Sequence, residues 1–435
     1  MFILLVKGIC SLVLTLAIGL LLWQRTRVEQ LLTTKKAPWL TLFFVFFRLL
    51  PFLGVYVVLG FEPQSDVQCF YPIVDSATRM EVPYVKAYNA YSPFFGYLLA
   101  IPLAIYDNIR VIVVTLLLLE AATVWLTQKI YLPQLSQGER LFRCLIYYLL
   151  PVSFVFAVFS GQEDTLVWGA ALAGLWLWQT RQNAFLGGMA LGVGLLLTKA
   201  TFVLLMIPLF LLTRKKVSFV AGAALVGIPV LIWLYLKTGT LFLDQPLYEG
   251  DKIKAPNWRS VLNPVLAGNV SLNGVIGKWI TLALLLITIG AATFWVRKRD
   301  ALTGYLPMLY IAIFAAMSVL QQNAISVYAF AFMLPLVFCL TNFRAKTEVT
   351  ILLIFNLLAA NHPSVWWRMG QPYFTFSSFS NPLYLAEYVM EWLIVAGFCW
   401  CTWLAIRQLR RDPIPTIPLT HNPSPEVEGR NIALQ

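Results

Sequence analysis

Residues 38–60 read PWLTLFFVFFRLLPFLGVYVVLG and contain a single charged side chain, Arg48. This stretch can cross the hydrocarbon core of a bilayer, which takes about 20 apolar residues in a helix. Similar apolar runs recur along nearly the whole chain, and they lack the period-two alternation of outer-membrane strands. The sequence therefore predicts an all-α, polytopic transmembrane helical bundle with about 12–14 apolar segments, some of them short or re-entrant.

The composition supports this class and excludes a soluble enzyme. Hydrophobic residues make up 59% of the 435 residues and charged residues only 12%, with a mean hydropathy of +0.75. The net charge of +12 would suggest nucleic acid in a soluble protein, but here Lys and Arg gather in short turns between apolar runs. That is the positive-inside pattern. We therefore expect membrane lipids and no nucleic acid among the partners.

The basic turns predict the orientation of the chain. They lie at residues 25–36, 129–143, 181, 214–216, 297–299, 344–346 and 407–411. If these turns are cytoplasmic, the run 38–60 points outward and the polar stretch 61–91 is an extracytoplasmic loop. The later polar loops fall on the same face, at residues 237–273, 321–326 and 361–381.

Two segments do not fit a simple series of crossings. Residues 92–106 form an apolar run of about fifteen residues where a span needs roughly twenty, so we expect a short or re-entrant helix. For residues 184–212, two short helices that meet at Thr198 and Lys199 are an alternative to one span. Residues 1–411 are predicted to form one multi-pass membrane domain, and the Pro-rich, polar residues 412–435 a disordered cytoplasmic tail.

Acidic side chains occur at two places on the predicted outer face. Asp66 lies early in the loop 61–91, near the headgroups, where a carboxylate could act as general base on an acceptor hydroxyl. A solvated loop acid or a helix cap explains Asp66 equally well. Glu163 and Asp164 follow Gly161-Gln162 at the end of an apolar run and could add acidic groups to the same cavity, or they could be solvated loop acids.

The same loop is predicted to contain a short helix. Pro72 suits the first position of a helix, and Asp75 would then form an ordinary ion pair with Arg79. The apolar side chains Ile73, Ala77 and Met80 would lay this helix on the membrane surface.

Several cations could meet a phosphate group. Arg79 and Lys86 are candidates in the first loop, although charges at the rim of the loop fit them as well. Lys199 stands within an apolar run, where an ammonium is costly and normally faces a polar cavity or a partner. Arg48 and Glu120 lie near the middle of their runs, and a structural ion pair explains them as well as a role in the site does.

The late outer loop is rich in aromatic side chains. It contains His362, Trp366, Trp367, Arg368, Gln371 and Tyr373. An interfacial aromatic belt is the leading explanation, and binding of a sugar or phosphate is the alternative. Because the chain has only two histidines, we expect neither a histidine metal site nor a Ser-His hydrolase.

Five short elements follow one another between about residues 65 and 212. They are an acid in the first outer loop (Asp66), a Pro-Tyr pair (Pro83-Tyr84), a Tyr-Ser-Pro helix start (Tyr91-Ser92-Pro93), a Ser-Gly-Gln-x-Asp turn (Ser160 to Asp164) and a Lys in an apolar run (Lys199). In this order they resemble the C-type integral-membrane glycosyltransferases. Within that class the likeness is to the mannosyltransferase that adds the first mannose of glycosylphosphatidylinositol anchors and to its bacterial polyprenyl-phosphate-sugar-dependent relatives.

The resemblance implies inverting transfer of a hexose, with mannose favoured, from a polyprenyl-phosphate donor to a hydroxyl of a lipid or glycan acceptor. Asp66 is the predicted catalytic base. The predicted substrate-binding residues are Arg79, Tyr84, Lys86, Tyr91, Gln162, Glu163, Asp164, Lys199, His362 and Arg368. The mannosyltransferase carries Asp-x-Asp in this loop, whereas this chain reads Asp66-Val67-Gln68, so we expect no metal and no cofactor. Because a phosphate leaves without a proton donor, one carboxylate with nearby cations suffices for this chemistry.

Two other functions use the same residues. A transporter or flippase of lipid-linked sugars would use Arg48, Glu120 and Lys199 as a substrate path, although no internal repeat is visible. A non-catalytic scaffold subunit of a cell-envelope complex would leave the acids without a role. For all three, a bacterial inner membrane is favoured over the endoplasmic reticulum.

Overall fold

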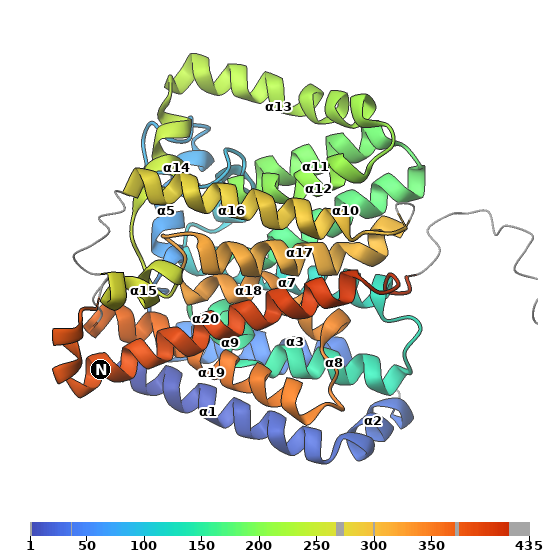
Figure 1. The fold of residues 1–435 in the computed structure, drawn as a ribbon, viewed down its shortest axis with the longest axis vertical. Coiled ribbons are helices and arrows are strands. Elements are labelled where there is room, and N and C mark those ends of the chain that lie inside the picture. The colour runs from blue at the N-terminus through green and yellow to red at the C-terminus, as the bar shows by residue number, and fades with distance from the viewer. Residues whose placement is uncertain (1, 36, 267–273, 299–300, 370–373, 417–435) are drawn as a thin grey trace, which may run out of the picture.

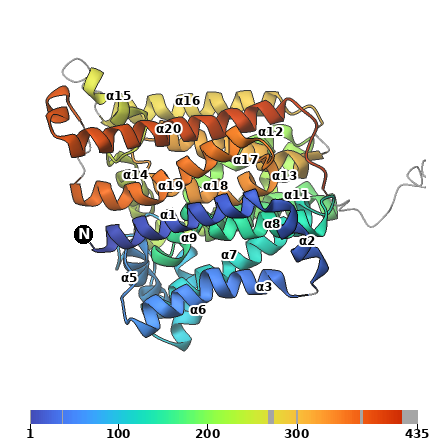
Figure 2. The ribbon, with the colours of Figure 1, turned by 90° about the horizontal axis from the view of Figure 1, so that it is seen from below.

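The computed structural model describes residues 2–35, 37–266, 274–298, 301–369 and 374–416. Within these ranges the chain forms helices and contains no β-strand, which confirms the predicted all-α bundle. Figures 1 and 2 show the long helices packed side by side, most of them running between two opposite ends of the molecule.

Eight helices in the described part of the chain are long and apolar enough to cross a membrane. They are α1 (Phe2–Trp23), the continuous run of α3 (Trp39–Phe44), η1 (Val45–Leu49), α4 (Leu50–Phe52) and η2 (Leu53–Val58), then α7 (Ile109–Tyr131), α13 (Lys216–Thr238), α16 (Gly274–Phe294), α17 (Leu302–Leu320), α19 (Lys346–Met369) and α20 (Pro382–Leu409). A further crossing consists of α8 (Gln137–Leu149) with α9 (Pro151–Phe154) and η3 (Val155–Phe159), if these elements, bent by 62°, count as one span. The chain is therefore a multi-pass membrane protein.

Shorter elements complete the bundle. They are α2 (Arg25–Thr34), α5 (Asp66–Thr78), α6 (Phe95–Ile105), α10 (Asp164–Arg181), α11 (Ala184–Leu197), η4 (Ala200–Phe202), α12 (Val203–Leu212), α14 (Leu241–Asp251), α15 (Trp258–Leu266), η6 (Ser326–Tyr328), α18 (Ala329–Pro335), η7 (Leu336–Leu340) and η8 (Phe376–Ser380). The central helix is α17, since 94% of its most apolar stretch is buried. It packs against α16, α18 and α20, as Figure 1 shows.

The two ambiguous segments are both short helices. The 11 residues of α6 span only about 16 Å, roughly half of a bilayer core, so the predicted short helix is confirmed. Residues 184–212 form two helices, α11 and α12, that are interrupted at Thr198 and Lys199. The break brings polar backbone and a lysine into the interior of an otherwise apolar bundle.

The polar loops gather at one end of the molecule. In Figure 1, α5, α14 and α15 lie at the left end, and Figure 2 agrees. The basic turn at α2 and the C-terminal end of α20 lie at the opposite end. The first outer loop and the loop that contains α14 and α15 therefore share one end of the bundle, as the positive-inside pattern predicts.

The predicted tail begins with ordered chain. The amide of Ile414 donates a hydrogen bond of 3.2 Å to the carbonyl of Gly304 at the start of α17. An added Cβ at Gly304 would overlap Pro413 and Ile414, so the glycine permits this close approach. Residues 417–435, the rest of the predicted tail, lie outside the described residues.

The helix of the first loop differs from its prediction. It begins at Asp66, not at Pro72, which lies inside it. The apolar side chains Ile73 and Ala77 are buried and face Gly96 of α6. Because Gly96 has no side chain, α5 packs directly on α6, and this part of its apolar face is not free to lie on the membrane.

Arg48 and Glu120 form a structural ion pair. Two guanidinium nitrogens of Arg48, Nε and Nη2, donate to the Glu120 carboxylate at 2.7 and 2.9 Å, and Nη1 donates to the Tyr148 carbonyl at 3.0 Å. Arg48 also donates to the hydroxyl of Ser153, and the Tyr147 hydroxyl donates to Glu120 at 2.8 Å. Both charged side chains are buried. Such a pair is tolerated because its hydrogen bonds are satisfied, and it holds the second span against α7 and α8.

Helices α11 and α13 pack through two glycines, and we expect a larger residue there to separate them. An added Cβ at Gly188 would overlap the carbonyl of Phe219, and one at Gly222 would overlap the carbonyl of Phe185. Gly188→Val should lower the free energy of unfolding by about 1–3 kcal/mol through overpacking. The measurement is detergent unfolding, with Gly227→Val as control because nothing lies near a Cβ at Gly227. Equal stability of the two variants would contradict this packing.

Candidate active site

The turn after η3 meets the start of α5. Gly161 has a φ of +54°, and an added Cβ there would overlap the side chain of Val67. Glycine is therefore required on both grounds. This close approach brings Gln162 beside Asp66, whose Oδ2 accepts a 2.9 Å hydrogen bond from the Gln162 side-chain amide. The other carboxylate oxygen, Oδ1, accepts none from the residues described.

Lys199 joins two acids of the same turn. Its Nζ lies 2.5 Å from Glu163 Oε1 and 2.6 Å from Asp164 Oδ1. The Lys199 side chain is 17% exposed, whereas those of Glu163 and Asp164 are 1% and 4% exposed. Glu163 Oε2 and Asp164 Oδ2 are buried and accept no hydrogen bond in the described part of the chain. The break between α11 and α12 thus places the Lys199 ammonium beside the two acids at the start of α10.

Two tyrosine rings flank the ammonium. The centroids of Tyr91 and Tyr328 both lie 5.6 Å from Lys199 Nζ, within the range of cation–π attraction. Tyr84 holds the backbone of Tyr91 in place, because its buried hydroxyl donates a 2.7 Å hydrogen bond to the Tyr91 carbonyl. The amide of Phe94 donates to the Leu196 carbonyl at 3.0 Å, which fixes the segment from Tyr91 to Phe94 along the end of α11.

Burial changes the acidity of the site. It raises the pKa of Asp66 above the usual range, against the hydrogen bond from Gln162 and the positive charge of Lys199. Burial also raises the pKa of Glu163 to about 7, again opposed by Lys199. Burial therefore favours the protonated form of both carboxyls, and the nearby ammonium of Lys199 favours the ionised form.

The loop that contains α14 packs against the first outer loop, residues 61–91. The Gln245 side chain on α14 donates to the Tyr84 carbonyl at 2.9 Å and accepts from the Asn89 amide at 2.8 Å. Lys254 pairs with Glu249 at 2.7 Å. The positive charge of Lys254 also lowers the pKa of Asp66, so it lies within electrostatic reach of the carboxylate. The loop therefore brings a second cation, paired with Glu249, within electrostatic reach of Asp66.

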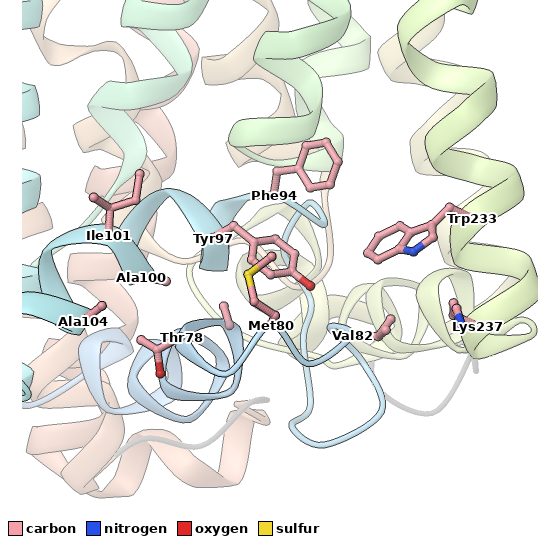
Figure 3. Close-up of a pocket in the computed structure, with 11 residues that line it drawn as sticks. Thr78, Met80, Val82, Phe94, Tyr97, Ala100, Ile101, Ala104, Trp233 and Lys237 are labelled. Carbon is pink, nitrogen blue, oxygen red and sulfur yellow. The ribbon is translucent and has the colours of Figure 1, made fainter.

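An apolar hollow of about 780 Å³ lies beside this site. Figure 3 shows Trp233 of α13 directed toward Phe94, and Tyr97 of α6 and Met80, which follows α5, also line the hollow. Lys237 lines the hollow from the last turn of α13. The segment that carries Tyr91 continues into Phe94, so the polar site and the hollow adjoin the same short segment.

The structure brings together six of the predicted site residues. They are Asp66, Tyr91, Gln162, Glu163, Asp164 and Lys199, with Tyr84 directly behind Tyr91. Arg79 is not among them. It follows the last of the 13 residues of α5, about 20 Å along the axis from Asp66, and pairs with Asp75 at 2.7 Å as predicted.

Three other predicted residues also lie apart from this cluster. Lys86 is exposed, and its positive charge lowers the pKa of Glu81. Arg368 is exposed and donates to the Ser364 carbonyl of its own helix. His362 is fully buried between α19 and α20. Gln371 and Tyr373 of the predicted aromatic loop lie outside the described residues.

Two residues near the site, Tyr328 and Lys254, are not among those predicted from the sequence. Tyr328 stands in η6, at the start of an apolar run that gives no polar signal. Lys254 lies in the polar loop 237–273, whose placement on the same face as Asp66 was the available signal.

Comparison with known protein families and with curated proteins finds no match to this chain. Its function is therefore inferred from the site and from the order of its sequence motifs.

Proposed function

We propose that the protein is an inverting glycosyltransferase that moves a hexose from a polyprenyl-phosphate donor to an acceptor hydroxyl. The observation that carries the proposal is the convergence of Asp66 and Gln162 with the cluster of Lys199, Glu163 and Asp164. These residues come from three separate segments, and in the same order they resemble the C-type integral-membrane glycosyltransferases. One half-buried carboxylate and one half-buried ammonium suit a base and a phosphate-binding cation.

The reaction needs one base and one place for a leaving phosphate. Oδ1 of Asp66 accepts the proton of the acceptor hydroxyl while the acceptor oxygen attacks the anomeric carbon. The bond between that carbon and the phosphate oxygen breaks, and its electron pair leaves with the polyprenyl phosphate. An ammonium has three N–H donors, and two of those of Lys199 face Glu163 and Asp164. The third, with Lys254, is available to the departing phosphate.

We assign the apolar hollow of Figure 3 to the lipid part of the donor. Its lining of Phe94, Tyr97, Ile101 and Trp233 suits an isoprenoid chain, and its volume is in the range of ligand pockets. The isoprenoid chain would lie at the Phe94 end of the Tyr91–Phe94 segment, and its phosphate at the Tyr91 end, beside Lys199. Mannose as the sugar, a lipid or glycan acceptor, the extracytoplasmic face and a bacterial inner membrane complete the proposal.

The class of donor can be tested on the purified protein. Two donors are compared, a labelled hexose on polyprenyl phosphate and the same labelled hexose on a nucleotide. Each is supplied together with a membrane-lipid extract as acceptor. We expect label in the extract only from the lipid-phosphate donor. Transfer from the nucleotide sugar would overturn the proposal. So would movement of the labelled donor across sealed vesicles without any transfer, which is the result expected of a flippase.

The transfer rate should fall on acidification. The base works only when ionised, and burial raises the pKa of Asp66. Activity should therefore be full at high pH and be lost as the pH drops through a value above the ordinary Asp pKa of about 3.9. Initial transfer rates across the pH range measure this loss of activity at low pH. The Glu163→Gln variant should show the same loss. A rate that does not depend on pH from acid to neutral would contradict the assignment of the base.

A further inference from the structure

A second polar cluster lies within the apolar helices α19 and α20. His362, Glu387 and Glu391 are 0%, 1% and 0% exposed. Neither imidazole nitrogen and none of the four carboxylate oxygens has a hydrogen-bond partner in the parts of the chain that are described. Buried polar groups are almost always satisfied, and an unpaired buried carboxylate costs several kcal/mol. These buried polar atoms are therefore open to a ligand.

The three side chains converge on one point. Glu387 and Glu391 are four residues apart and share a face of α20, and His362 approaches from α19. One ligand atom from each lies within 4.8 Å of the others, and His362 Nε2 lies 3.8 Å from Glu391 Oε1. Around a tetrahedral Zn²⁺, with bonds of about 2.0–2.2 Å, ligand atoms stand roughly 3.4 Å apart. Small side-chain rotations would close the remaining gap.

We propose that His362, Glu387 and Glu391 bind a divalent transition-metal cation of the Zn²⁺ class. One imidazole nitrogen and two carboxylate oxygens are ligands that this class accepts. Two glutamates and a neutral histidine carry a charge of −2, which a divalent cation cancels, and this leaves a neutral site in apolar surroundings. A lysine or arginine would give only one positive charge, and the described residues show no such ion pair to either glutamate.

The cation would act as a cross-link between two spans. It would join the end of α19 to the first turns of α20, on either side of the loop that connects them. Helix α19 also packs on η6, which carries Tyr328 of the candidate active site. The proposal does not depend on sugar transfer, because it rests on the ligands of the cluster alone.

The test measures metal directly, on protein purified without a polyhistidine tag. After dialysis against a chelator and addition of Zn²⁺, elemental analysis should find one Zn²⁺ per chain, and Zn²⁺ should raise the melting temperature. Co²⁺ in place of Zn²⁺ should give the visible absorption bands of a low-symmetry site. Loss of an outer-shell partner weakens metal sites about 10–100-fold. Glu391→Gln and His362→Asn remove direct ligands and should therefore weaken binding by at least about 100-fold.

His421→Ala is the matched control, since it removes the other histidine of the chain and should bind Zn²⁺ as the wild type does. Absence of stoichiometric Zn²⁺ or Co²⁺ from the folded wild-type protein would overturn the proposal, even if the variants fail to fold. Unchanged binding in folded Glu391→Gln and His362→Asn would overturn it as well.

Discussion

Replacing Lys199 with Met should lower the free energy of unfolding by about 3–5 kcal/mol and abolish sugar transfer, because removing one partner leaves buried charges uncompensated. Lys199 Nζ is the cation nearest to both Glu163 and Asp164, at 2.5 and 2.6 Å. Without it these buried carboxylates must either stay unpaired or take up protons. The loss of stability should therefore grow as the pH rises, which detergent unfolding at several pH values can measure.

A second variant separates stability from chemistry. Combining Lys199→Met with Glu163→Gln and Asp164→Asn removes the uncompensated charges and should recover much of the lost stability. Transfer should remain absent, since the cation for the phosphate is still missing. Lys215→Met, an exposed lysine at the start of α13, serves as control and should match the wild type. If Lys199→Met is as stable and as active as this control, the ion-pair account of the site fails.

Replacing Asp66 with Asn should lower the transfer rate by a factor of about 10²–10⁴, the usual contribution of a general base. The change is nearly isosteric, and an amide oxygen can still accept the hydrogen bond that Gln162 donates at 2.9 Å. The fold and donor binding should therefore persist while the proton acceptor is lost. Initial transfer rates and the melting temperature, measured on the same preparation, distinguish these effects.

Asp75→Asn is the control for this experiment. Asp75 belongs to the same helix, but it pairs with exposed Arg79 and lies away from the Lys199 cluster. We expect its transfer rate to equal that of the wild type. An Asp66→Asn variant that matches Asp75→Asn in rate would remove Asp66 from the reaction.

The sequence predicts the fold class well because apolar length and helical period are local properties. The break at Thr198 and Lys199 and the short helix at 95–105 are visible in the same way. Which loop residues meet depends on packing between segments far apart in the chain. Arg79 shows the limit: it belongs to the same loop as Asp66, yet the helix between them separates the two along its whole length.

The buried cluster of α19 and α20 shows a different limit. Counting histidines argues against a metal site, since His362 has a single companion in the sequence. The available signal was Glu387 and Glu391, two carboxylates four residues apart in an apolar run. Only the packing of α19 on α20 adds the imidazole to them.

The stereochemical course of transfer tests the central claim most directly. One carboxylate that deprotonates the acceptor, with a phosphate leaving from the opposite face, requires a single displacement at the anomeric carbon. Magnetic resonance analysis of the glycoside formed from a polyprenyl-phosphate hexose of known anomeric configuration should therefore find that configuration inverted. A product with retained configuration, or no product from any such donor, would contradict the account.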